Sequence, residues 1–410
     1  MTQFVETPPR AAETKEPVRY VGMAPAGGAG SRGHGAASPG PAARDAPGSS
    51  NVPNAQAAAA PVAAPAPKRS SVRRVSSGMR VILPGVKTFA RKGTPDDHRT
   101  REGRDGAVTA PRYAGSVLQS RSVSTDRPAW LPEDLYPFQS RYVEVGEARL
   151  HYIDEGSGPT LLLLHGNPTW SFLYREIIKE LRGQFRCVAV DYPGFGLSAA
   201  PPRYGFTPAE HADVVEGFVQ QLDLTAVTLM VQDWGGPIGF AVATRQPDRF
   251  ARFVIGNTWA WPATDLGTQA FSRLLGSPLG RYLIERRNFF VETILPRGVR
   301  RTHLPEAVMN AYRGPFPTPE SRRPVYVFPR EIVRSKVFLA DVASKLPRLS
   351  DRPALLCWPT ADFAFREPER VRWEQLFPDH RTLRLQGAGH YIQEDAWQEI
   401  VTAIRQFVAP

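Results

Sequence analysis

The carboxy-terminal two thirds of the chain carry apolar residues in short, regularly spaced runs. Residues 140–158 alternate polar and apolar positions around a central Gly-Glu pair, which predicts a hairpin of half-buried strands. Residues 160–166 follow as TLLLLHG, a continuous apolar run that is typical of a parallel strand covered on both faces. We therefore expect a sheet that starts with a hairpin and continues with buried parallel strands.

Strand-like and helix-like patterns alternate along the rest of this region. A further helix is expected directly after the strand that ends at residue 233. The other expected strands are 186–191, 226–233, 250–257, 353–359 and 381–387, and the other expected helices are 170–181, 208–223, 367–378 and 394–408. The alternation predicts fold class α/β, with a mostly parallel, doubly wound sheet built by right-handed crossovers.

The alternation stops after residue 257 and resumes at about residue 351. Residues 259–350 contain helix-like pieces rich in Phe, Leu and Arg, and these pieces are separated by prolines. The breaking prolines are Pro278, Pro296, Pro305, Pro315, Pro317 and Pro319. An insertion at the ligand-binding edge of a doubly wound sheet is a natural lid. We expect an α/β core in two parts, 129–258 and 351–410, with a helical cap at 259–350.

Composition separates the first 128 residues from this core. Residues 21–70 are dominated by Ala, Gly, Pro and Ser and have little to bury, so we expect 1–128 to form a disordered, basic extension. Of the 51 Lys and Arg and 40 Asp and Glu in the chain, residues 1–130 hold 19 and 9. The net charge of +11 therefore comes almost wholly from the extension.

The extension contains a basic patch, residues 68–92, and the sequence does not determine what this patch does. It could contact an acidic partner, nucleic acid or a membrane surface, or it could be a solvated linker or an over-long translation start. Because no nucleic-acid fold signature accompanies the charge, we predict no specific nucleic acid or membrane partner.

Few other features of the composition point to function. Cys187 and Cys357 lie in apolar, strand-like runs, as small buried residues of a protein in a reducing compartment do. We find neither an apolar run long enough to span a membrane nor a secretory signal, and expect a cytoplasmic protein. The eight histidines and two cysteines show no metal-ligand spacing, and no dinucleotide fingerprint is present. No metal and no cofactor are therefore expected.

Residues 229–240, LMVQDWGGPIGF, have the outline of a nucleophile elbow. A buried strand ends at Asp233, and glycines at 235, 236 and 239 let strand and helix approach closely. The elbow leaves the Trp234 amide at a helix N-terminus, where it can stabilise negative charge. Asn167, after the earlier strand in HGNP, would supply a second amide of an oxyanion hole.

Two more polar residues follow predicted strands. Asp362 lies in WPTADFAF and His390 lies in QGAGHYIQED. With Asp233 they give the order nucleophile, acid, histidine, which is the chain order of the α/β-hydrolase triad. Singly, each has an ordinary explanation as a helix cap or loop residue. The combination, in this order and together with the elbow, predicts a catalytic site.

These motifs resemble those of the haloalkane dehalogenases, from about residue 130 to the end of the chain. The motifs are HGNPTWSFLYRE, DYPGFGLS, QDWGGPIG, GNTWAWP, ADFAFRE and GHYIQED. The resemblance is closest to the subfamily in which the triad acid follows the later strand, and that subfamily includes β-lactone decarboxylases of olefin synthesis. It implies an α/β-hydrolase fold with an inserted helical cap, and a small apolar organic substrate.

The resemblance also implies a role for each site residue. Asp233 would displace halide and form an alkyl ester, and His390 would activate the water that hydrolyses this ester. Asp362 would orient the imidazole. Trp234 and Asn167 would bind the departing halide through neutral N–H groups. Asn257 stands where another subfamily has its triad acid, and an amide cannot supply that charge.

Competing functions remain at this stage. Epoxide hydrolases also use an Asp nucleophile, often in the same DWGG, and the cap contains Tyr282, Tyr312 and Tyr326 as possible proton donors. Fluoroacetate dehalogenases need arginines beside the nucleophile, where this chain has Gly236 and Pro237. Nothing in the sequence separates a β-lactone decarboxylase from a dehalogenase. A hydrolase fold kept only for binding would be expected to lack a triad residue, and none is missing.

Several aromatic residues near the motifs could shape the pocket or simply pack in the core. They are Trp259, Trp261, Phe271, Phe289 and Phe290. Glu394, close behind His390, is expected to cap the final helix and to take no part in chemistry.

Overall fold

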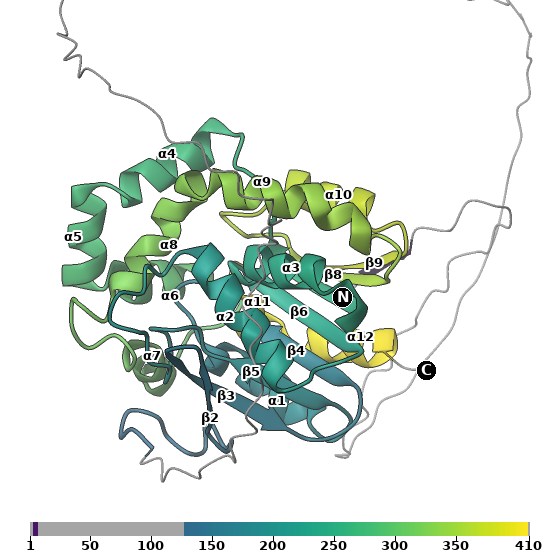
Figure 1. Ribbon diagram of the computed structural model, residues 1–410, viewed down its shortest axis with the longest axis horizontal. Coiled ribbons are helices and arrows are strands. Elements are labelled where there is room, and N and C mark those ends of the chain that lie inside the picture. The colour runs from purple at the N-terminus through teal and green to yellow at the C-terminus, as the bar shows by residue number, and fades with distance from the viewer. Residues whose placement is uncertain (1–2, 7–126, 409–410) are drawn as a thin grey trace, which may run out of the picture. The chain divides into compact units, whose positions relative to one another are not determined.

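The computed structural model describes residues 3–6 and 127–408 (Figure 1). Its strands are β1 (Gln3–Glu6), β2 (Arg141–Val145), β3 (Ala148–Glu155), β4 (Thr160–Leu164), β5 (Arg186–Val190), β6 (Val227–Asp233), β7 (Phe250–Thr258), β8 (Ala354–Pro359) and β9 (His380–Leu385). Within the described residues they form one sheet, in the order β1-β9-β8-β7-β6-β4-β5-β3-β2.

Helices connect these strands. The α-helices are α1 (Arg175–Leu181), α2 (Pro208–Gln221), α3 (Gly235–Arg245), α4 (Leu266–Leu275), α5 (Pro278–Arg287), α6 (Leu295–Gly298), α7 (Glu306–Arg313), α8 (Arg323–Arg334), α9 (Lys336–Lys345), α10 (Glu367–Leu376), α11 (Ile392–Asp395) and α12 (Trp397–Val408). Short 3₁₀ turns are η1 (Ser171–Tyr174), η2 (Pro247–Arg249) and η4 (Leu346–Leu349), and η3 (Phe290–Ile294) is a π-helical turn.

The strand pairing confirms the predicted doubly wound sheet. Strands β4 to β9 pair in parallel, and β4 lies between β5 and β6. The predicted hairpin is β2–β3, and its second strand pairs antiparallel with β5. Because the carboxyl ends of the parallel strands lie at one edge of the sheet, the loops after β4, β6, β7, β8 and β9 meet there.

Helices cover both faces of this sheet, which explains the continuous apolar runs. In Figure 1, α3 and α10 lie above the central strands, and α1 and α12 lie below them. The α2 helix packs against α3, and α1 packs against α12. Residues 161–164 of β4 are completely buried as a result. A strand covered on both faces has no polar side, so it reads as uniformly apolar in the sequence.

The predicted disordered extension falls mostly on residues 7–126, outside the described part of the chain. Residues 3–6, which we assigned to that extension, form β1 and pair antiparallel with β9. The reason is that an edge strand such as β9 presents unpaired backbone groups that another strand can take up.

Between β7 and β8 the chain forms a helical insert, residues 259–353, which contains α4 to α9 and no described strand. The prolines that we expected to separate the helical pieces include Pro278, which starts α5, and Pro305, which precedes α7. Pro296 is the second residue of α6, and Pro329 lies inside α8. Not every proline of the insert therefore separates two helices.

The single final helix expected at 394–408 is wrong. The structure has a short helix, α11, and then α12, separated by Ala396, whose backbone is not helical (φ −148°, ψ 25°). The carboxylates of Glu394 and Asp395 bind groups outside this helix. The chain turns at Ala396 before α12 begins.

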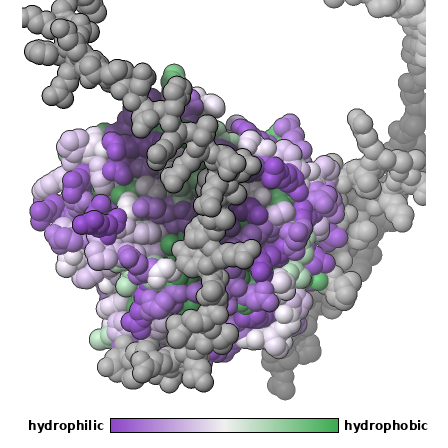
Figure 2. Space-filling view, in the orientation of Figure 1, coloured by the Kyte–Doolittle hydropathy of each residue, from purple (hydrophilic) through white to green (hydrophobic). Residues whose placement is uncertain are grey.

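On the face of the molecule shown in Figure 2, the described residues are largely hydrophilic, with scattered hydrophobic ones. Within the described residues, no helix is both long and apolar enough to cross a membrane. Cys187 and Cys357 are unpaired and buried, as expected, and burial raises the pKa of both thiols to about 12. Such thiols are inert as nucleophiles near neutral pH.

The turn between β6 and α3 requires a residue without a side chain at 235. A Cβ atom on Gly235 would lie 2.2 Å from the carbonyl oxygen of Leu164, at the end of β4. The backbone of α3 therefore approaches the neighbouring strand more closely than any other residue would allow.

We expect Gly235→Ala to lower the free energy of unfolding by about 1–3 kcal/mol, because the added methyl forces the two backbones apart. Chemical denaturation monitored by circular dichroism measures this. Gly183→Ala is the matched control, since a Cβ at Gly183 has no atom within 4 Å. Equal stability of the two variants would contradict the close packing at the turn.

Candidate functional site

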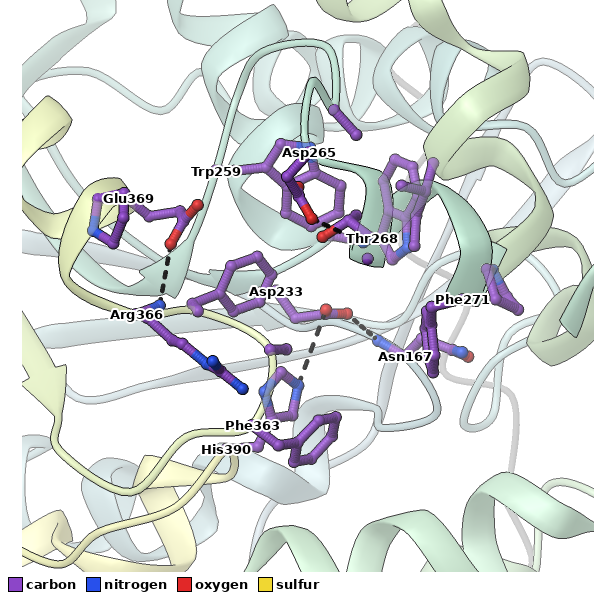
Figure 3. Close-up of a pocket in the computed structure, with 18 of the residues that line it drawn as sticks. Asn167, Asp233, Trp259, Asp265, Thr268, Phe271, Phe363, Arg366, Glu369 and His390 are labelled. Carbon is purple, nitrogen blue, oxygen red and sulfur yellow. Dashed lines mark hydrogen bonds and ion pairs between the residues drawn. The ribbon is translucent and has the colours of Figure 1, made fainter. Parts of the chain in front are cut away.

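Asp233 ends β6 and lies on the sharp turn before α3 (Figure 3). Its φ of 50° lies in the left-handed region, which residues other than glycine seldom adopt and which is a form of strain typical of functional sites. The backbone amide of Asn167 donates to Asp233 Oδ1 at 2.8 Å, and Thr258 Oγ1 donates to the Asp233 carbonyl at 2.5 Å. The loop after β4 and the last residue of β7 thus hold the turn in place.

His390, in the loop after β9, lies between two carboxylates. Its Nδ1 is 3.2 and 3.1 Å from the two carboxylate oxygens of Asp362, which follows β8. Its Nε2 is 3.8 Å from Asp233 Oδ2. The structure therefore brings together all three residues that the sequence motifs singled out as a triad.

Two buried amides support this arrangement. Asn257, at the end of β7, donates from Nδ2 to Asp362 Oδ2 at 2.6 Å and to the His390 carbonyl at 2.7 Å. Gln232 Nε2 donates to the same carbonyl at 3.2 Å. The Ala364 amide donates to Asp362 Oδ1 at 2.7 Å. Neutral donors therefore fix both the Asp362 carboxylate and the backbone carbonyl of His390.

The environment changes the acidity of both Asp233 and His390. Burial raises the pKa of Asp233 above its ordinary value, and His390 and the amides of Asn167 and Trp234 offset this only in part. Burial lowers the pKa of His390, but the Asp362 and Asp233 carboxylates outweigh it, and the net pKa is raised. His390 is therefore a stronger base than an ordinary histidine.

A cavity of about 540 Å³ lies against this triad and is lined by Asp233 and His390. That volume falls within the range of ordinary small-molecule pockets. Apolar side chains of the insert, among them Phe271, Phe290 and Ile332, form much of its wall. Figure 3 shows Asp233, Asn167 and His390 directed toward one another at the cavity.

Trp234 and Asn167 also line the cavity. Trp234 is buried, stacks on Phe328 with ring centroids 5.1 Å apart, and meets Trp259 at 4.7 Å. Asn167 Nδ2 donates to the Val325 carbonyl at 3.3 Å, and because an amide nitrogen carries two hydrogens, a second N–H remains beyond that bond. Two neutral donor side chains thus stand next to the Asp233 carboxylate.

Comparison with known proteins identifies the fold and the family. Residues 159–396 match the model of a family described as alpha/beta hydrolase fold. Haloalkane dehalogenase 2 of Mycobacterium tuberculosis is 49% identical over 273 residues, which are 66% of this chain and 95% of that relative. The chain belongs to the haloalkane dehalogenase family of α/β hydrolases.

Further relatives define the range of this family. Cis-3-alkyl-4-alkyloxetan-2-one decarboxylase of Shewanella oneidensis is 32% identical over 286 residues, 67% of this chain and 90% of that relative. The solved structure of haloalkane dehalogenase DbeA from Bradyrhizobium elkani USDA94 has a TM-score of 0.62 and 27% identity, covering 66% of this chain and 98% of its own. The solved structure of haloalkane dehalogenase DatA from Agrobacterium tumefaciens C58 has a TM-score of 0.60 and 27% identity, covering 65% of this chain and 95% of its own. The resemblance inferred from the motifs is confirmed, and the protein is a haloalkane dehalogenase-like hydrolase.

In this dehalogenase-family chain the three tyrosines of the insert lie away from the cavity. Tyr312 is fully buried and donates to Glu394, Tyr326 donates to the Gly276 carbonyl at 3.0 Å, and Tyr282 is half exposed. The one tyrosine among the described lining residues is Tyr391, in the histidine loop.

The aromatic residues that we expected to shape the pocket divide into two groups. Trp259, Trp261, Phe271 and Phe290 line the cavity, and Phe289 is not among the described lining residues. Two further rings, Phe363 and Phe365, were not singled out from the sequence. They lie 5.2 and 5.8 Å from the His390 ring and belong to the motif ADFAFRE, which was the available signal.

Polar groups at the edge of the cavity are engaged in helix capping. Asp265 Oδ1 accepts from the Thr268 amide at 2.7 Å at the start of α4. Glu369 accepts from the Arg366 amide at 2.9 Å at the start of α10 (Figure 3). In the described part of the chain, no cluster of three or more His, Cys, Asp or Glu side chains could hold a metal ion.

Sequence reasoning assigned Glu394 to a helix cap, and this is wrong. Its buried carboxylate binds Arg175 through two hydrogen bonds of 2.5 and 2.7 Å. Asn257 was considered only as an unsuitable acid, whereas it contacts both Asp362 and His390. Its place directly after a central strand was a signal that could have indicated this contact.

The electrostatic balance at His390 can be measured directly. We expect Asp362→Asn to lower the pKa of His390, since the carboxylate that outweighs burial is then gone. NMR titration of protein labelled in its histidine rings measures this pKa. Asp265→Asn, which removes a carboxylate at the cavity edge, should leave it unchanged. A His390 pKa unaltered by Asp362→Asn would contradict the described ion pair.

Proposed function

We propose that this protein hydrolyses haloalkanes to an alcohol and a halide ion, through an ester formed on Asp233. The observation that carries the proposal is the Asp233 carboxylate itself. One oxygen accepts the Asn167 amide and the other faces His390, at the wall of a cavity that is largely apolar. A carboxylate needs no base to become a nucleophile, since it is already ionised near neutral pH.

The first step is an in-line displacement at the carbon that bears the halogen. A carboxylate oxygen of Asp233 forms a C–O bond while the C–halogen bond breaks, and the halogen leaves with the bonding electron pair. The indole N–H of Trp234 and the side-chain amide of Asn167 donate to the halide as its charge develops. Neutral donors stabilise an anion in a dry pocket without holding it as a salt.

The second step hydrolyses the ester. His390 Nε2 takes a proton from a water molecule, whose oxygen attacks the carbonyl carbon of the esterified Asp233. The backbone amides of Asn167 and Trp234 stabilise the resulting oxyanion. Asp362 stabilises the imidazolium and keeps Nε2 unprotonated beforehand. The alcohol leaves, Asp233 is regenerated, and the net reaction consumes one water and releases one proton with the halide.

The helical insert serves as the cap of this site. It supplies Phe271, Phe290 and Ile332 to the cavity wall. These side chains exclude water from the displacement step, which strengthens every electrostatic interaction inside the cavity. They also favour a small apolar organic substrate over a charged one.

The alternatives fit these observations less well. An epoxide hydrolase would need proton donors on the cap, yet Tyr282, Tyr312 and Tyr326 lie outside the cavity lining. A fluoroacetate dehalogenase would need arginines beside the nucleophile, where α3 has Gly236 and Pro237. The named decarboxylase relative is 32% identical, against 49% for the named dehalogenase, which favours dehalogenation.

A product screen tests this function. The protein is incubated separately with 1-bromobutane, styrene oxide and a cis-3,4-dialkyl β-lactone, and halide, diol and alkene are measured. We expect bromide and 1-butanol from the first compound. Alkene release from the lactone with negligible bromide would replace the proposal with a decarboxylase, and diol alone would indicate an epoxide hydrolase.

The same assay on two variants tests the covalent step. Asp233→Asn should release no bromide, because the nucleophile is lost. His390→Phe should release about one bromide per protein and retain a butyl group on Asp233, which mass spectrometry of the peptide detects. Bromide release by Asp233→Asn at the parent rate would refute the mechanism.

Halide stabilisation is tested by Trp234→Phe, which removes one N–H donor and keeps an aromatic ring. We expect the rate constant for bromide release to fall by about 100-fold, as for the loss of one oxyanion-hole donor. Hydrolysis of a preformed ester should change little. Trp397→Phe, on the half-buried start of α12, is the matched control. Bromide release at the parent rate would exclude Trp234 as a halide ligand.

A further inference from the structure

Two adjacent carboxylates, Glu394 and Asp395, follow His390 on α11. Both are almost completely shielded from solvent, with 6% exposure of the Glu394 side chain and of Asp395. Neither touches the cavity described above. A buried carboxylate costs free energy unless it is paired and hydrogen-bonded, so the partners of each carboxylate indicate what it does.

Asp395 joins the histidine loop to the insert. Its Oδ2 accepts from the amide of Gly389, directly before His390, at 2.7 Å and from the amide of Arg300 at 2.9 Å. Its Oδ1 accepts from the amide of Arg301 at 2.8 Å. Residues 300 and 301 belong to the insert, just after α6. One carboxylate thus holds the two chain segments together through three backbone donors.

The backbones of these segments are in direct contact as well. The His390 amide donates to the carbonyl of Gly298, the last residue of α6, at 2.7 Å. A Cβ on Gly389 would lie 2.1 Å from that same carbonyl oxygen. Only glycine permits this approach, so the position of the His390 backbone depends on where the insert lies.

Glu394 makes a second connection, to a different part of the insert. Arg175 of α1 binds both of its carboxylate oxygens, and the guanidinium lies over the Phe172 ring at 4.2 Å. The hydroxyl of Tyr312, on α7, donates to Glu394 Oε1. The Glu394 carboxylate and the Arg175 guanidinium therefore neutralise each other within the core, and Tyr312 links this ion pair to the insert.

We propose that Glu394 and Asp395 are positioning residues for His390, and that residues 298–312 of the insert set the place of the imidazole through them. The inference rests on the proposed two-step reaction. Asp233 is held by β6, by the Asn167 amide and by Thr258, and neither carboxylate has a hydrogen bond to these residues. Loss of the contacts therefore impairs ester hydrolysis, which needs His390, and spares ester formation, which does not.

Asp395→Asn and Tyr312→Phe test the two connections in the full-length protein. Rapid-quench experiments with 1-bromobutane give the rate constant of ester formation from the first equivalent of bromide, and that of hydrolysis from 1-butanol. A misplacement of 1 Å can cost on the order of 100-fold in rate. We expect hydrolysis to fall by about tenfold in Asp395→Asn and by roughly threefold in Tyr312→Phe. Ester formation should stay within about twofold of the parent, and the ester on Asp233 should accumulate.

Two matched controls lie in the same insert. Asp341→Asn removes a carboxylate that pairs with Lys345 on the surface of α9. Tyr326→Phe removes a hydroxyl whose partner is the Gly276 carbonyl. Both should leave the two rate constants at parent values. Thermal denaturation of all four variants confirms folding, and Tyr312→Phe keeps the test valid if Asp395→Asn does not fold, because it removes a single oxygen atom.

Parallel loss of both rate constants, or no change relative to the controls, would overturn the inference. Failure of the underlying reaction is a separate result. If His390→Phe forms no ester on Asp233, the proposed function falls regardless of what the positioning variants do.

Discussion

An ionised carboxylate in an apolar cavity is the constraint on which the rest of this structure depends. Taking such a group out of water is expensive, and it stays charged only if donors replace the lost hydration. The donors here are the amides of Asn167 and Trp234, together with the His390 imidazole. They can reach Asp233 because Gly235 lets α3 start directly against the end of β4. The strained backbone at Asp233 belongs to the same tight turn as this close packing.

The proposed nucleophile Asp233 and the histidine are supported by separate parts of the molecule. Asp233 is held by the central strands and their loops, which are the most buried part of the sheet. His390 is held by Asn257 and Gln232 on the core side and by the carbonyl of Gly298 on the insert side. The imidazole therefore lies at a junction between core and insert, whereas the backbone of Asp233 is held by core residues.

The sequence predicts the sheet and the meeting of three polar residues at its edge, because both follow from local rules. Buried parallel strands are continuous apolar runs, and polar residues directly after such strands meet at one edge of the sheet. This reasoning places Asp233, Asp362 and His390 together, as the structure does.

Features that depend on distant partners were not predictable in the same way. Glu394 looks like a helix-capping residue in its own segment, and its true partner Arg175 is 219 residues earlier in the chain. The break at Ala396 has no helix-breaking residue beside it, since residues 391–400 contain neither glycine nor proline. The packing of α4 to α9 depends on how several amphipathic helices fit together, which periodicity alone does not determine.

The Glu394 and Asp395 contacts divide the insert into two zones with different freedom to vary. Residues 298–312 are tied to the histidine loop, while Phe271 on α4 and Ile332 on α8 reach the cavity from helices without such ties among the described contacts. Substitutions at Phe271 on α4 can therefore remodel the cavity without touching the histidine loop, whereas α8 also carries Val325 and Phe328, which contact Asn167 and Trp234. Residues 298–312 leave less room for change, because their backbone holds the loop that carries His390.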